Sequence, residues 1–210
     1  MSFDLDVYGR LRPFLFHLTD SGNLSRIRRT RSLESTTSLA TRAGNEHILD
    51  KRRVAHVSVR VDDSLVSLRD QAPLHRGNMQ FEEGWSFERF VRHLNDRVFF
   101  WPGGEEGPIS YGRRHFGRYE IESPSIIRVR FDSFAAVNPQ TELLFSKCNS
   151  GSPRWSRGIP ASRGARTFLS PAEAPFVAAQ VVEVTIVEGA RLPDDAAVGE
   201  KLDGPWRALF

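Results

Sequence analysis

Alternating and near-continuous apolar segments along the chain predict a set of short β-strands. Residues 13–18 form an apolar run that ends in a turn, and residues 54–61 alternate apolar and polar positions, as a half-buried strand does. Further strands are predicted by the apolar or alternating segments at 97–101, 126–131, 142–146 and 180–187.

Fewer segments have helical periodicity. Residues 21–23 offer helix-capping side chains before an apolar stripe that continues to Leu33. Ser86 is a predicted cap for a helix over 87–94, where apolar residues recur at helical spacing. The run Asp62-Asp63-Ser64 predicts the cap of a short helix that extends through Arg69.

Several short strands, few helices and no alternation of strand and helix predict an α+β fold. A chain of 210 residues that is 40% hydrophobic can bury one sizeable core, so we expect a single domain over 1–210. Within it we expect a core over about 13–187, a basic loop over about 147–166 and an acidic C-terminal tail over about 188–210.

The sequence also bears on compartment and on metal binding. Its apolar runs are shorter than the roughly 18 residues of a membrane span, and its first residues are acidic where a signal peptide is basic. The single cysteine, Cys148, excludes a disulfide framework and a zinc site of several thiolates. We therefore expect a soluble, cytoplasmic protein that does not contact membranes and holds no metal.

The basic residues are unusual in type and in position. Three of the 29 basic residues are lysine, and the others are arginine, which forms bidentate contacts with phosphate. A GC-rich genome would also explain the excess of arginine, but not its distribution. Residues 143–172 hold five basic residues, no acid and Trp155, in a stretch without periodicity. Such a loop is a candidate track for a polyanion, either a nucleic acid or the smaller anion NAD.

The chain has no P-loop, dinucleotide-binding, zinc-protease or nucleophile-elbow motif. The candidates for chemistry are instead three polar clusters at the ends of apolar runs. The clusters are His17, Thr19 and Asn23; Arg69, Asp70 and Gln71; and residues 95–97 together with residues 148–151. Helix caps, turns and internal ion pairs are the structural alternatives for each cluster. Cys148 is either an inert core residue or, less simply, a nucleophile paired with a distant histidine.

The order of these motifs resembles a known family. The run Pro13-Phe14-Leu15-Phe16-His17-Leu18-Thr19, followed by Asn23-Leu24 and Ile27, is similar to the opening of the DarT-type DNA ADP-ribosyltransferases. Residues 57–65 and 168–186 resemble later strands of that family. Arg69-Asp70-Gln71, residues 94–101 and Asn149-Ser150-Gly151 resemble an uncharacterised bacterial branch of the same fold. The resemblance implies a mixed, largely antiparallel sheet.

The resemblance also implies roles and one departure from the family. His17 and Thr19 would lie at the nicotinamide-ribose side of NAD, with Asn23 beside that pocket. The family places a catalytic glutamate on the strand after the substrate loop, but residues 164–169 contain no carboxylate, and Glu173 comes several residues later.

A scaffold that splits the glycosidic bond of NAD could instead split the bond between a base and its sugar in DNA. We therefore predict first a DNA glycosylase that needs no cofactor and removes a base, including a modified one, in phage defence or repair. Its predicted catalytic residues are Asp70, His17 and Gln71; its substrate-binding residues are Thr19, Asn23, Arg69, Asn95, Arg97, Asn149 and Ser150; and its DNA contacts are Arg154, Trp155, Arg157 and Arg163.

Two alternatives stay open. An NAD-dependent ADP-ribosyltransferase toxin that modifies DNA bases, with an antitoxin partner, would need Glu173 or Glu142 to replace the missing glutamate. A non-catalytic nucleic-acid-binding module would bind DNA in a salt-sensitive manner and form no product.

Overall fold

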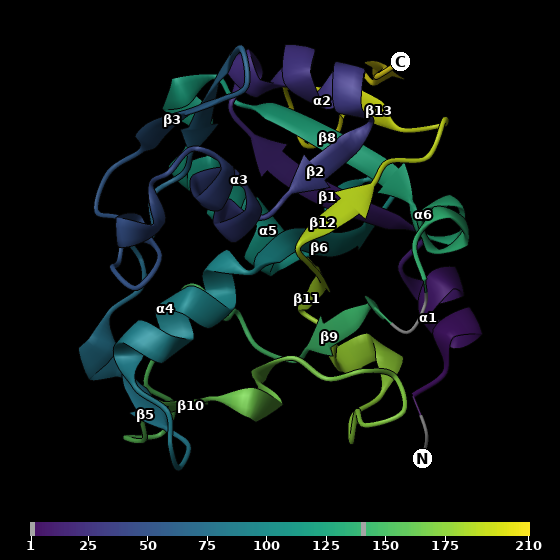
Figure 1. Cartoon of the computed structure of the whole chain (residues 1–210). Coiled ribbons are helices and arrows are strands. Elements are labelled where there is room, and N and C mark those ends of the chain that lie inside the picture. The colour runs from purple at the N-terminus through teal and green to yellow at the C-terminus, as the bar shows by residue number, and fades with distance from the viewer. Residues whose placement is uncertain (1–2, 140–141) are drawn as a thin grey trace.

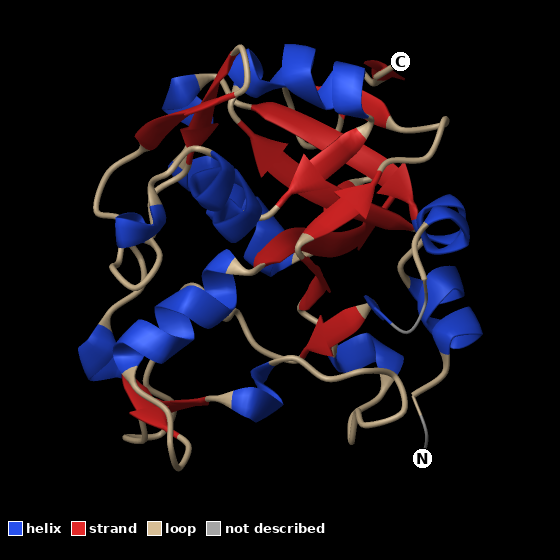
Figure 2. Ribbon diagram, in the orientation of Figure 1, coloured by secondary structure: helices blue, strands red, loops and turns tan. Residues whose placement is uncertain are grey.

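An antiparallel sheet forms the centre of the molecule (Figures 1 and 2), in a computed structural model that describes residues 3–139 and 142–210. The strand order is β14-β13-β8-β1-β6-β11-β9, and β7 pairs with β6. Its strands are β1 (Phe14–Thr19), β6 (Arg97–Gly104), β7 (Gly107–Pro108), β8 (Ser125–Arg130), β9 (Leu144–Ser146), β11 (Glu183–Val187), β13 (Ala197–Gly199) and β14 (Arg207–Ala208). With its helices this sheet confirms the predicted α+β class.

Alternation along β1 sorts its side chains onto the two faces of the sheet. Phe14 and Phe16 pack on one face, against residues of α5 (Ser110–Arg118). Leu15 packs on the other face, in a core shared with α1 (Leu5–Leu11), α2 (Leu24–Thr30) and α6 (Phe131–Val137). His17 and Thr19 follow Leu15 at intervals of two, so they share its face at the end of the strand.

The segment predicted as a helix over 64–69 is a strand, so that prediction was wrong. β3 (Val57–Val61) and β4 (Ser64–Leu68) form an antiparallel hairpin in which Val61 pairs with Ser64. Asp62 adopts a left-handed conformation with φ of 52°, which two-residue hairpin turns require and which aspartate tolerates. Alternate burial of Val66 and Leu68 confirms the period of two.

Two smaller pairs of strands complete the β-structure. β5 (Met79–Phe81) pairs in parallel with β10 (Ala161–Arg163), which gives part of the predicted loop a fixed place. β2 (Ser32–Glu34) pairs with β12 (Gly189–Arg191). The helix that begins at Leu24 ends before Arg31, whose φ is 53°, so Leu33 of the predicted apolar stripe lies on strand β2.

The predicted helix over 87–94 is confirmed as α4 (Phe87–Asn95), and the Ser86 hydroxyl accepts a hydrogen bond from the Arg89 N–H as its cap. The helix α3 (Thr36–Arg42) is capped by Ser35, whose hydroxyl accepts a hydrogen bond from the Ser38 N–H. Short 3₁₀ turns lie at Ser21–Asn23, Glu46–Ile48, Arg76–Asn78, Glu120–Glu122, Ala165–Thr167 and Ala178–Gln180.

The core extends beyond the expected 13–187 at both ends. Tyr8 on α1, Val198 on β13 and Leu209 are all buried in the main core. The segment predicted as an acidic tail, 188–210, also supplies three strands, β12, β13 and β14. In the described part of the chain, the helices are too short or too polar to cross a membrane.

Candidate functional site

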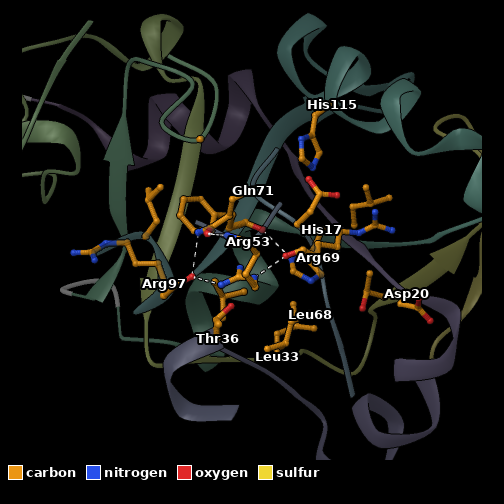
Figure 3. Close-up of a pocket in the computed structure, with 18 of the residues that line it drawn as sticks. His17, Asp20, Leu33, Thr36, Arg53, Leu68, Arg69, Gln71, Arg97 and His115 are labelled. Atoms are coloured by element: carbon orange, nitrogen blue, oxygen red, sulfur yellow. Dashed lines mark hydrogen bonds between the residues drawn. The ribbon is translucent and has the colours of Figure 1, made fainter. Parts of the chain in front are cut away.

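The polar clusters predicted from sequence meet in one cavity of about 270 Å³. It lies at the end of β1, between β4, the first residues of β6 and the loop over 149–152. Figure 3 shows His17, Arg53 and Gln71 close together in this cavity. Ten predicted site residues line it: His17, Thr19, Asn23, Arg69, Asp70, Gln71, Asn95, Arg97, Asn149 and Ser150.

His17 is held as a neutral imidazole. Its Nδ1 lies 2.9 Å from the backbone carbonyl of Phe99, so Nδ1 carries the hydrogen and Nε2 is an acceptor. Burial lowers the pKa of His17 to about 4. At neutral pH this residue can therefore accept a hydrogen bond from a ligand, but it cannot protonate a base, a role that its sequence position left open.

Asp70 is fixed in orientation by three groups. Its Oδ1 accepts hydrogen bonds from the Ala72 N–H at 2.7 Å and from the Tyr119 hydroxyl at 3.1 Å. Its Oδ2 lies 3.3 Å from Nδ1 of His56. Burial and the neighbouring Asp70 raise the pKa of Tyr119 to about 12, so the tyrosine keeps its proton and remains a donor.

Glu183, the first residue of β11, also lines this cavity, and sequence reasoning missed it. Its side chain is buried, and Oε2 accepts a hydrogen bond from the Ser150 N–H at 3.1 Å. Burial raises the pKa of Glu183 to about 7. A charged residue between Val182 and Val184 in a predicted buried strand was the available signal.

The two carboxylates proposed from sequence as substitutes lie elsewhere. Glu173 is exposed and accepts hydrogen bonds from the backbone and the hydroxyl of Ser170. Glu142 is also exposed and lines a different cavity, beside Asn138.

Among the described residues, four carboxylates line the main cavity: Asp20, Glu34, Asp70 and Glu183. Asp20 accepts the Gly22 N–H and Glu34 pairs with Arg26 and Arg42, so Glu183 and Asp70 are the better candidates for the carboxylate that the ADP-ribosyltransferase hypothesis requires.

Some of the predicted ligand contacts serve the scaffold. The Asn95 side-chain oxygen accepts hydrogen bonds from Arg53 at 2.8 Å and from the Gln71 amide at 3.1 Å, and its amide donates to the Leu49 carbonyl at 2.8 Å. The Gln71 oxygen also accepts the Arg53 N–H. Both amide side chains are engaged within the protein, so they position the cavity wall, and Gln71 is not free to act on a base.

Asn23 has a similar internal role. Its side chain accepts the N–H of Ser67 at 2.9 Å and donates to the Ser67 carbonyl at 3.0 Å. It also donates to the Thr19 hydroxyl at 3.2 Å. The Asn23 side chain thus bonds both backbone groups of Ser67, as a residue on a neighbouring strand would, and holds the hairpin β3–β4 against the end of β1.

Arg97 and Asn149 are engaged at the edge of the cavity. The Arg97 guanidinium donates to the His93 carbonyl, stacks over the Phe168 ring and is directed away from Arg53 (Figure 3). The Asn149 side-chain oxygen accepts the Ser152 N–H at 3.1 Å. These residues shape the wall rather than present free charges to a ligand.

Aromatic rings form another wall of the cavity. The ring centroid of His115 lies 5.4 Å from that of Trp101 and 5.3 Å from that of Tyr119. Gly112 permits this arrangement, because a Cβ there would lie 2.9 Å from the Trp101 Cβ. Burial lowers the pKa of His115 to about 3, so its ring is neutral. Trp101 and Tyr119 are buried, and the Arg69 guanidinium covers the Tyr119 ring, so His115 is the partly exposed ring of this wall.

The predicted DNA contacts divide into two groups. Arg154 and Trp155 line a second cavity of about 420 Å³, and Arg118 and Ser152 belong to both cavities. Trp155 is 54% exposed. The predicted surface track thus adjoins the mouth of the main cavity.

Two of the predicted contacts lie apart from this groove. Arg157 is exposed, at a φ of 50°. Arg163 is buried and donates to the carbonyls of Asn149 and Ser162, each at 2.8 Å. Arg163 therefore supports the loop from inside and cannot contact DNA, which corrects its predicted role.

The donor set does not assemble a metal site in the described chain, where His, Cys, Asp and Glu side chains form no group of three or more able to hold an ion. Cys148 is partly buried, and burial raises the pKa of its thiol. This environment favours the interpretation of Cys148 as an inert residue.

Comparison with known proteins gives one match. Neither the curated proteins nor the solved structures contain a match to this chain. The matching model is described as a family of unknown function (DUF7002), and it covers residues 13–196, a range that includes every residue of the main cavity. The chain therefore belongs to that family of unknown function.

Proposed function

We propose that the protein is an enzyme that breaks the N-glycosidic bond of a nucleotide, and specifically a DNA glycosylase. The observation that carries the proposal is that the carboxyl groups of Asp70 and Glu183 line the same cavity. Bond cleavage of this kind needs one group that gives a proton to the leaving base and one that takes a proton from water.

The surroundings of the two groups support different roles. A carboxyl group with a pKa of about 7 holds a proton over much of the physiological range, so Glu183 is suited to protonate the base. Asp70 accepts two hydrogen bonds and is suited to orient and deprotonate water. Water then adds to the sugar carbon, Asp70 takes its proton, and the base leaves with the proton of Glu183.

The cavity wall favours a nucleobase as the leaving group. The partly exposed His115 ring, packed beside Trp101 and Tyr119, offers a surface on which a flat base can stack. Nε2 of His17 can accept a hydrogen bond from an amino or hydroxyl group of the nucleotide. A base in duplex DNA must leave the stack to reach such a cavity.

The adjoining groove supports DNA as the partner. Arg118 belongs to both cavities, and Arg154 and Trp155 line the groove beside it. A cationic groove with an exposed aromatic ring can bind the phosphates that flank the extruded base.

The proposal is tested by incubating the protein with plain and with phage-modified duplex DNA, each with and without NAD, followed by mass spectrometry. We expect free base and an abasic strand, independent of NAD. Asp70→Asn should lower the rate by a factor of about 100 or more while DNA binding is retained. Asp63→Asn, on the exposed hairpin turn, is the matched control. Equal activity of Asp70→Asn and the unaltered protein would remove Asp70 from the mechanism.

Glu183 also favours a second candidate, NAD-dependent ADP-ribosylation of DNA. Residues 164–169, where the DarT-type family has its catalytic glutamate, contain no carboxylate. Glu183 places one in the cavity that His17 and Thr19 also line. A DNA strand heavier by one ADP-ribose, formed only with NAD, would select this activity. Salt-sensitive DNA binding without any product would instead select a non-catalytic binding module.

A further inference from the structure

Arg53 brings a positive charge into the main cavity without an acidic partner in the protein. The residue is partly buried and lies close to His17 in the cavity (Figure 3). Burial lowers the pKa of Arg53 to about 10, so its guanidinium remains charged at neutral pH. In the described chain, no carboxylate oxygen lies within 4.0 Å of its nitrogens. A charge withdrawn from water in this way is costly unless an anion accompanies it.

The protein fixes two nitrogens of this guanidinium and leaves the third free. Nε of Arg53 donates to the Arg69 carbonyl at 2.9 Å, and Nη1 donates to the Asn95 side-chain oxygen at 2.8 Å. The N–H groups of Nη2 have no hydrogen-bond partner among the residues that the structure describes. Because Arg69 and Asn95 hold the plane of the group, the direction of these free donors is already set.

The other arginines that line the cavity are engaged or lie at its mouth. Arg26 and Arg69 are both paired with glutamates. Arg97 stacks over a phenylalanine ring at its edge. Arg118 is exposed and belongs to the adjoining groove as well. Among the described residues, Arg53 is therefore the cation that the interior of the cavity offers to a ligand.

The carboxyl groups of the cavity do not take the place of that ligand. The charge of Asp70 is near enough to raise the pKa of Arg53, but its Oδ1 is turned to the Ala72 N–H and the Tyr119 hydroxyl. Glu183, with a pKa of about 7, is partly protonated at neutral pH. An anion on Arg53 would thus lie in the neighbourhood of the carboxylate that the proposed reaction uses.

We propose that Arg53 binds the phosphate group of the nucleotide whose glycosidic bond is cleaved at Asp70. This inference rests on the proposed function and narrows its substrate to a nucleotide, as opposed to a nucleoside or a free base. Arginine N–H groups form short, charge-assisted hydrogen bonds with phosphate oxygens, and Nη2 supplies them here. The phosphate comes either from a DNA strand or from a free nucleotide, since both present the same group.

Isothermal titration calorimetry with the deoxynucleoside 5′-monophosphates of the four bases, and with the matching deoxynucleosides, tests this site. At least one monophosphate should bind the unaltered protein about tenfold more tightly than its nucleoside does. In Arg53→Gln the two ligands should bind alike, with the affinity for the nucleoside retained. Arg53→Lys keeps the charge and should recover part of the preference. Arg60→Gln, at an exposed arginine of β3 that lines neither cavity, is the matched control.

A single-stranded trinucleotide of the best-bound base distinguishes the two sources of the phosphate. If it binds more tightly than the monophosphate, and Arg53→Gln weakens this binding, the phosphate belongs to a DNA strand. If it binds no more tightly, while the monophosphate keeps its dependence on Arg53, the phosphate belongs to a free nucleotide.

Two results would overturn the phosphate site. One is that every monophosphate binds the unaltered protein no better than its nucleoside, or that neither binds. The other is an equal loss of both ligands in Arg53→Gln, because Arg53 would then only support the cavity wall. Phosphate-dependent binding without any release of base would leave this site in place and overturn the proposed function instead.

Discussion

At the scale of single residues, position along the chain predicts which side chains reach the cavity better than what each one does there. Ten predicted residues line it because all lie where apolar segments end. The roles of Asn95 and Gln71 were not predictable, because their hydrogen bonds join segments far apart in the chain. Glu183 was missed because its valine neighbours mark a core strand, and its charge, the one available signal, does not say that the strand begins at a cavity.

Replacement of Glu183 by glutamine should stabilise the fold in a pH-dependent manner. The folded-state pKa of Glu183 is about 7, above its ordinary value near 4.5. Between these values the folded state binds more protons than the unfolded state, so the free energy of unfolding falls as pH rises and levels off above pH 7. Glutamine does not titrate, so Glu183→Gln should gain roughly 2–3 kcal/mol relative to the unaltered protein between pH 4.5 and pH 8.

Urea denaturation of both proteins at the two pH values measures this difference. The exposed Glu173→Gln is the control, because burial does not oppose the charge of Glu173. The Glu183→Gln variant should also lose base release if Glu183 protonates the leaving base. A stability difference that is identical at pH 4.5 and pH 8 would contradict a raised pKa at this site.

At the scale of elements, periodicity predicted α4 and five strands of the main sheet, β1, β6, β8, β9 and β11. It missed β7, β13 and β14, and the segment after residue 61 was assigned to a helix. Two aspartates before a serine are equally compatible with a helix cap and with a hairpin turn. The tertiary contacts that decide between them come from Asn23, which binds both backbone groups of Ser67 on β4. Such a long-range partner cannot be read from local pattern.

Asn23→Ala should therefore loosen the hairpin β3–β4. It leaves the Ser67 N–H without its partner, which should cost about 1–3 kcal/mol of folding free energy. Amide hydrogen exchange in β3 and β4 should become faster than in β1 and β8, which are paired within the main sheet. Asn45→Ala, which removes only a local hydrogen bond to the Ala43 carbonyl, should cost about 0.5 kcal/mol or less. Equal costs at the two positions would show that Asn23 does not anchor the hairpin.

At the scale of the whole molecule, the location of charge matters more than its total. The formal net charge is only +3, and many arginines are paired with acids or buried. Arg26 and Arg42, for example, share Glu34 and Asp62 in one network, and Arg163 lies inside the loop. A count of basic residues in the sequence cannot separate these from the arginines that face solvent beside the cavity.

This distinction predicts how DNA binding responds to salt. Arg154→Ala should weaken binding and reduce the slope of log K against log salt by about 0.9, the effect of one lost phosphate contact. Trp155→Ala should weaken binding by about 1–3 kcal/mol and leave that slope unchanged, since stacking releases no counterions. Arg10→Ala removes the same charge from an exposed position on α1 that lines neither cavity, so its slope should match that of the unaltered protein. Titrations of labelled duplex at several salt concentrations measure all three. If Arg10→Ala and Arg154→Ala flatten the slope equally, binding follows the overall charge of the molecule, and the groove beside the cavity is not the path of the DNA.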